Sequence, residues 1–221
     1  MKTTTRRDAI RRFGAGAALL GVITASGCAA SERNADSAPS VTRATPSLAA
    51  GDRSNGADNF YTSDRVDVQK VTFKNQYGMK VAGNLFVPKD LNRNAKSAAM
   101  VVGHPMGAVK EQSANLYATK LAERGFVTMS LDMSFWGESD GQPRNAVSPD
   151  IYAEDFSAAV DFLRTQSFVD RERIGALGIC GSGSFVISAA KIDPRIKAVA
   201  TVSMYDMGAA NRNGLRQSVT L

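Results

Sequence analysis

The chain has 221 residues, which is enough for one domain of ordinary size together with an N-terminal segment and a linker. Hydrophobic residues make up 43% and charged residues 22%, which is typical of a globular protein and excludes a wholly disordered or collagen-like chain. Residues 1–27 hold five of the 27 basic residues and one of the 21 acidic residues, which leaves 22 basic and 20 acidic residues in the remainder. We therefore expect no nucleic-acid partner.

The first 27 residues have the pattern of an export signal. Arg6 and Arg7 precede an uncharged stretch, residues 13–26, which is rich in Gly and Ala and shorter than the ~20 apolar residues that a membrane-spanning helix needs. This arrangement resembles a twin-arginine signal peptide, which implies export of the folded protein. The alternative is an amphipathic basic helix that stays on the mature protein.

A cysteine follows the signal directly. Residues 25–28, Ala-Ser-Gly-Cys, resemble a lipobox, in which Cys28 would be acylated and anchor the protein to a membrane. Cleavage at an ordinary small-residue site nearby is the alternative. We expect an exported protein that is periplasmic or a membrane-anchored lipoprotein. Residues 28–60, which are rich in Ser, Ala, Asn and Asp, are expected to form a flexible linker, and residues 61–221 the folded domain.

Two kinds of strand are predicted in the folded domain. Segments 66–74 and 79–88 alternate polar and apolar residues around Asn-Gln-Tyr-Gly, which predicts an antiparallel hairpin. Four short apolar runs follow, and such runs are typical of strands buried on both faces of a parallel sheet. These runs are residues 98–103, 126–131, 174–179 and 196–202.

Helices are predicted between the apolar runs. Ser113 is expected to cap the first helix and Gly125 to stop it, and Ser148-Pro149 to open the second. A third begins near Ser182 and ends before Pro194. The inner face of the second helix is predicted to comprise Tyr152, Phe156, Ala159, Val160 and Leu163. The order predicts a doubly wound, mostly parallel α/β sheet with an antiparallel N-terminal hairpin, and no regular element is expected in residues 211–221.

The candidate chemistry lies after the third apolar run. Residues 178–183, Gly-Ile-Cys-Gly-Ser-Gly, end a predicted strand and open a predicted helix, which is the context of a nucleophile elbow. Cys180 would stand at the helix N-terminus, where the helix dipole favours a thiolate. Gly178 and Ser182 are small enough to let the strand and the helix pass closely. The alternatives are a buried, inert Cys180 and a nucleophilic Ser182; a phosphate-binding loop is disfavoured because no Lys follows.

Three motifs together resemble the α/β-hydrolase superfamily, in the branch similar to dienelactone hydrolase that carries a Gly-x-Cys elbow. The first is the elbow itself, with Ser182 where Gly is commonest. The second, residues 104–107, is similar to the loop that supplies half of an oxyanion hole. The third, residues 132–141, is similar to an Asp-x-x-Gly-x-Gly-x-Ser turn, with Trp136 where Gly often stands.

The resemblance implies transfer of an acyl group from a small-molecule ester, thioester or lactone to water. Cys180 would attack the carbonyl, and the N–H groups of Gly181 and Met106 would bind the oxyanion. The only histidine in the sequence, His104, precedes the nucleophile, so it is expected to support its loop rather than act as the base. Asp206 is the candidate for the acid. We expect no metal and no cofactor, because one histidine and scattered carboxylates form no ligand cluster.

Members of the superfamily place the acid and the histidine after the nucleophile, and this sequence has no histidine there. We interpret it as a fragment or a prematurely ended version of a longer exported hydrolase, α/β in fold and incomplete at its C-terminus, with impaired activity. The alternative is a non-catalytic, truncated lipoprotein that keeps the hydrolase scaffold to bind a small molecule or a partner.

Overall fold

The computed structural model describes residues 60–214 and residue 218. The predictions for the signal in residues 1–27, for Cys28 and for the linker up to residue 59 lie outside these residues. Within the described part of the chain, no helix combines the length and the hydropathy that crossing a membrane would take.

The predicted N-terminal hairpin is present. Strands β1 (Val66–Lys74) and β2 (Lys80–Pro88) pair antiparallel from Val66↔Pro88 to Lys74↔Lys80. The side chain of Asn75 closes the turn, because its Oδ1 accepts the N–H of Tyr77 and of Met79, both at 3.1 Å. Most of β1 is exposed, whereas β2 is buried from Val81 onward.

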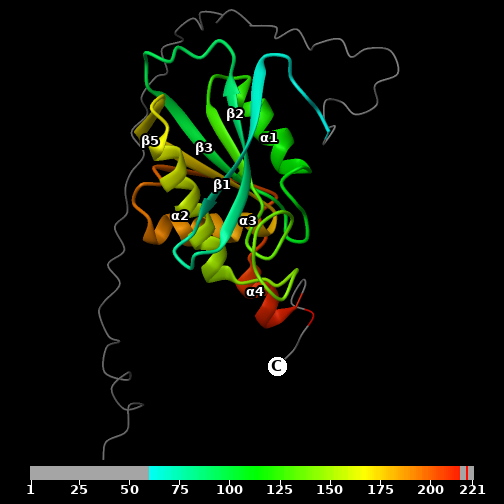
Figure 1. The fold of residues 1–221 in the computed structure, drawn as a ribbon. Helices are drawn as coiled ribbons and strands as arrows, with labels where there is room; N and C mark the ends of the chain where they lie inside the picture. Colours follow the sequence, from blue (N-terminus) through cyan, green and yellow to red (C-terminus); the bar gives the residue numbers. More distant parts are fainter. Residues whose placement is uncertain (1–59, 215–217, 219–221) are drawn as a thin grey trace, which may run out of the picture. The chain divides into compact units, whose positions relative to one another are not determined.

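The sheet has six strands in the order β1-β2-β4-β3-β5-β6 (Figure 1). Strands β4, β3, β5 and β6 are parallel to one another, whereas β2 pairs antiparallel with β4. The predicted doubly wound, mostly parallel sheet with an antiparallel edge is therefore confirmed. The bounds of the later strands are β3 (Ser97–Gly103), β4 (Val127–Leu131), β5 (Val169–Ile179) and β6 (Ala198–Val202).

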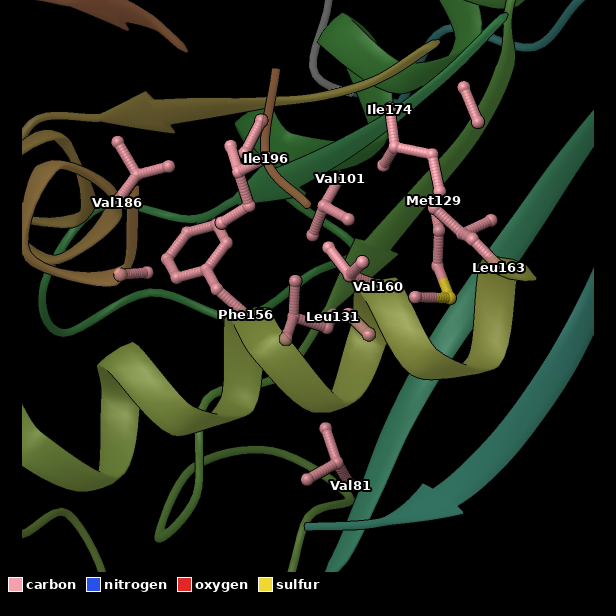
Figure 2. Close-up of a cluster of buried hydrophobic side chains, with 14 of the residues drawn as sticks. Val81, Val101, Met129, Leu131, Phe156, Val160, Leu163, Ile174, Val186 and Ile196 are labelled. Atoms are coloured by element: carbon pink, nitrogen blue, oxygen red, sulfur yellow. The ribbon is translucent and has the colours of Figure 1, made fainter. Parts of the chain in front are cut away.

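Helices pack on both faces of the sheet. The four helices described are α1 (Ser113–Ala122), α2 (Pro149–Thr165), α3 (Gly181–Ile192) and α4 (Met207–Asn213). The larger core lies between the sheet and helices α2 and α3; Figure 2 shows the side chains of α2 facing those of β3, β4 and β5. The smaller core lies under α1, whose three buried alanines pack with Phe86, Val102 and Leu177. All five residues predicted for the inner face of α2 are buried.

Three expectations from the sequence are wrong. Ser113 does not cap α1: it is the first residue of the helix, and its buried hydroxyl has no hydrogen-bond partner. Strand β6 is largely exposed rather than buried on both faces, because within the described chain it pairs with β5 alone. Helix α4 forms partly within the segment where no regular element was expected, and Asp206 precedes it.

Candidate active site

Cys180 occupies a sharp turn between β5 and α3. Its backbone has φ 53° and ψ −117°, a left-handed conformation that is strained for a residue with a side chain and is enriched at functional sites. The turn is held by the next strand and loop: the Cys180 N–H donates to Val202 C=O (2.9 Å), and Tyr205 N–H donates to Cys180 C=O (3.2 Å). The thiol is free and half-buried, and the turn places Cys180 directly after the carboxyl end of β5.

The small residues around Cys180 are needed for the close approach of strand and helix. A Cβ on Gly178 would collide with the backbone of Ser182. Ser182 is buried, and its hydroxyl donates to the C=O of His104. The Ser182 hydroxyl is thus used inside the protein, which disfavours it as a nucleophile and leaves Cys180 as the candidate.

Two free backbone donors lie beside Cys180. A Cβ on Gly181 would lie 3.5 Å from the nitrogen of Met106, so the two residues predicted as oxyanion donors are neighbours in space. Gly181 begins α3, and the first N–H groups of a helix have no partner within it. Among the described residues, neither this N–H nor that of Met106 has an acceptor. Such a pair of free donors next to a nucleophile can bind a developing oxyanion.

His104 fastens the loop that carries Met106. Its side chain is 2% exposed, and its Nε2 accepts the N–H of Met133 at 3.1 Å, so this nitrogen carries no proton. The proton of the neutral ring is then on Nδ1, which donates to Pro105 C=O at 2.7 Å. Burial lowers the pKa of His104, although the hydrogen bond to Pro105 and the nearby Asp132 charge oppose this effect. Both ring nitrogens are thus hydrogen-bonded to backbone groups of the protein.

The turn after β4 is built around a buried carboxylate. Asp132 accepts the backbone N–H of Lys110 (2.8 Å) and of Glu138 (2.9 Å), and Ser139 Oγ donates to Asp132 C=O (2.8 Å). A Cβ on Gly137 would collide with the Asp132 carboxylate, which explains the glycine of this motif. The motif therefore joins the loop after β3 to the loop after β4.

Lys110 completes this arrangement and was not predicted from the sequence. Its side chain is fully buried, and its Nζ lies 2.8 Å from Asp132 Oδ2 and 2.8 Å from Glu138 Oε2. A lysine in a loop belongs to no hydrophobic period that would indicate its burial. Its partner Asp132 is 22 residues away along the chain, so their contact is not a local one. The Asp132 motif was the only available indication that a buried cation was needed.

Asp206, the candidate acid, acts as a helix cap. Its carboxylate accepts the N–H of Ala209 at 2.8 Å and so satisfies a free donor at the start of α4. The side chain is exposed. Because both nitrogens of His104 have other partners, Asp206 does not orient that ring.

The loops that meet here carry the motifs of a known family. Residues 81–216, more than half of the chain, match the family model described as the dienelactone hydrolase family. The chain belongs to the dienelactone hydrolase family. The fold is that of the α/β hydrolase GrgF from Penicillium sp. sh18, whose crystal structure superposes with a TM-score of 0.58 at 25% identity, covering 62% of this chain and 46% of that one. The crystal structure of the hypothetical protein PA2218 from Pseudomonas aeruginosa superposes with a TM-score of 0.72 at 51% identity, covering 75% of this chain and 51% of that one.

Three curated relatives are similar to this chain over part of their length. The chain is 52% identical to the uncharacterized protein PA2218 of Pseudomonas aeruginosa, over 73% of this chain and 43% of that protein. It is 44% identical to the uncharacterized protein YcjY of Escherichia coli, over 68% of this chain and 50% of that protein. It is 35% identical to the thiohydrolase aneE of Aspergillus aculeatus, over 60% of this chain and 40% of that protein. The chain thus spans about half the length, or less, of these relatives.

Proposed function

We propose that this chain carries the acyl-accepting centre of a hydrolase of esters, thioesters or lactones, with Cys180 as the nucleophile. The observation that carries the proposal is the strained turn at Cys180, with two unpaired backbone N–H groups beside it. Membership of the dienelactone hydrolase family supports hydrolytic chemistry. The similarity to a protein named thiohydrolase supports thioesters as one substrate class.

In the proposed first half of the reaction, Cys180 accepts the acyl group. The Cys180 thiolate attacks the carbonyl carbon and forms a C–S bond. The negative charge moves to the carbonyl oxygen, where the N–H groups of Met106 and Gly181 stabilise it. The bond to the alcohol or thiol then breaks, the leaving group takes its electron pair, and an acyl group remains on Cys180.

Release of the acyl group needs an activated water. The sequence holds one histidine, His104. Its two ring nitrogens are already hydrogen-bonded to the backbone of Pro105 and Met133. Absence of a general base costs about 10²–10⁴-fold in rate. We therefore expect this chain to be acylated once and to turn over slowly.

The test uses p-nitrophenyl acetate and the full chain. We expect a burst of one equivalent of p-nitrophenolate, slow turnover afterwards, and one acetyl group on Cys180 by peptide mass spectrometry. Cys180→Ala should abolish the burst, whereas Cys28→Ala, which removes the other cysteine, should retain it. A burst that survives Cys180→Ala would refute the assignment, and brisk turnover that His104→Gln abolishes would show that His104 is a base.

A non-catalytic role on the same scaffold is the second candidate, and the engagement of both His104 nitrogens favours it. It predicts a folded chain in which p-nitrophenyl acetate leaves Cys180 unmodified. The same mass measurement therefore decides between the two candidates.

A further inference from the structure

Three methionines gather at the start of helix α3, next to Cys180. A Cβ on Gly181 would lie 3.0 Å from Met106 Cβ and 3.5 Å from Met207 Sδ. A Cβ on Gly183 would lie 2.7 Å from Met204 Cγ. The glycines one and three residues after Cys180 thus leave the room that these methionine side chains occupy.

Two of these methionines are open to solvent. Met106 is 46% exposed and Met204 is 45% exposed, whereas Met207 is buried. Single exposed apolar side chains are normal on a protein surface, but a group of them on two loops at one helix end is a candidate binding surface. Met106 follows β3 and Met204 follows β6, so the elbow of Cys180 lies between the two loops.

A groove of about 250 Å³ continues from this surface. It shares Met204 with this surface, and Tyr205, another of its lining residues, donates its N–H to Cys180 C=O at 3.2 Å. Its volume is below the ~300–1,000 Å³ of sites for drug-sized ligands, so it suits a small group. Asp206 is the charged residue of a lining otherwise formed by Met204, Tyr205, Ala209, Ala210, Asn213 and Gly214.

The chemistry of this lining selects among acyl groups. Methionine is unbranched and polarisable, so its side chain adapts to a flexible apolar chain. The negative charge of Asp206 at the groove disfavours a second carboxylate on the substrate. We propose that this surface binds the short, neutral, apolar acyl chain of the substrate, with Met204 as the residue that determines chain-length preference; this rests on Cys180 being the nucleophile, as proposed above.

The experiment compares the burst rates of p-nitrophenyl acetate and p-nitrophenyl hexanoate on the full chain. Partial burial of the four added methylene groups should make hexanoate react about tenfold faster. The p-nitrophenyl monoester of adipic acid, which has the same chain length with a terminal carboxylate, should lose this advantage. Met204→Ser should reduce the preference to about twofold, and Met204→Leu should keep most of it.

The control variant is Ile192→Ser, because Ile192 is exposed at the opposite end of α3. It should keep the preference of the unmodified chain, and circular dichroism should show that every variant is folded. Equal rates for acetate and hexanoate, or a preference that survives Met204→Ser, would overturn the inference while leaving Cys180 in place. Absence of any acyl group on Cys180 with either ester would instead refute the proposed function itself.

Discussion

At the scale of single residues, the buried charge of Lys110 is the most demanding feature of the site. Burial lowers the pKa of Lys110, but its hydrogen bonds to Asp132, Glu111 and Glu138 outweigh that effect and raise the pKa above its ordinary value. The same bond from Lys110, with one from Lys70, lowers the pKa of Glu138 to about 2. The ammonium group is therefore charged at neutral pH, and it offsets the fully buried carboxylate of Asp132.

Lys110→Met should destabilise the protein strongly. The substitution leaves Asp132 buried without its cation, and breaking a buried pair by removing one partner costs about 3–5 kcal/mol. Lys70→Met is the matched control, because Lys70 also contacts Glu138 but its side chain is 74% exposed; it should cost less than about 1 kcal/mol. Urea denaturation measures both free energies of unfolding, and equal losses in the two variants would contradict the assigned role of Lys110.

At the scale of secondary structure elements, a second buried carboxylate joins α2 to two loops. Asp155 of α2 accepts the N–H of Ser134 (2.7 Å), the hydroxyl of Ser134 (2.9 Å) and the Nδ2 group of Asn75 (2.9 Å). Asn75 forms the turn of the hairpin, and Ser134 follows β4. Burial raises the pKa of Asp155 to about 6, although these three hydrogen bonds act in the opposite direction.

This raised pKa predicts a pH dependence of stability. The folded pKa is about 6 and the ordinary value is 3.8, so the folded state holds the proton more tightly than the unfolded state does. The free energy of unfolding contributed by Asp155 should therefore fall as the pH rises from about 4 to about 6, by at most about 3 kcal/mol, and then level off. Urea denaturation over this pH range measures it.

Asp155→Asn is the reference for this prediction. The amide does not titrate, so the difference in free energy of unfolding between the two proteins should change over the same pH range. The amide also places an N–H₂ group against the donors of Ser134 and Asn75. The variant should therefore be less stable than the parent at low pH. A difference that is constant between about pH 4 and about pH 8 would show that Asp155 has no raised pKa.

The sequence predicts most elements because a run of apolar residues reports burial directly. Such runs predict β3, β4 and β5, polar–apolar alternation predicts β1 and β2, and helically spaced apolar residues predict α2. The exposure of β6 could not be predicted, since an apolar run is the same whether its strand is central or at an edge. Helix α4 has seven residues, about two turns, which is too short for a hydrophobic period to show.

The candidate site is predictable only in part. The glycine spacing at 178–183 indicates the turn at Cys180, because only small residues fit where a Cβ would collide with the backbone. The sequence does not indicate the position of Lys110 or the gathering of Met106 and Met204. Those contacts depend on how the loops after three different strands fold over one another.

At the scale of the whole domain, the strand order explains where the site lies. The chain runs from β3 to β4 on one side of β3 and then crosses to β5 on its other side. Such a reversal leaves a crevice at the carboxyl ends of the strands, where ligands of open α/β sheets bind. Gly103 at the end of β3 pairs with Gly178 near the end of β5, so the loops that carry Met106 and Cys180 emerge side by side.

Export of the protein is expected to depend on Arg6 and Arg7. Arg6 and Arg7 precede a weakly hydrophobic stretch, as in signals that direct folded proteins through the twin-arginine route. Replacing both with lysine should leave a precursor in the cytoplasm, because lysine keeps the charge but changes the paired guanidinium groups. Fractionation of expressing bacterial cells with immunoblotting measures this, and replacing Arg11 and Arg12 with lysine is the matched control that should retain export. Normal export of both lysine variants would rule out this route, since each variant alters one of the two neighbouring arginine pairs without changing the charge.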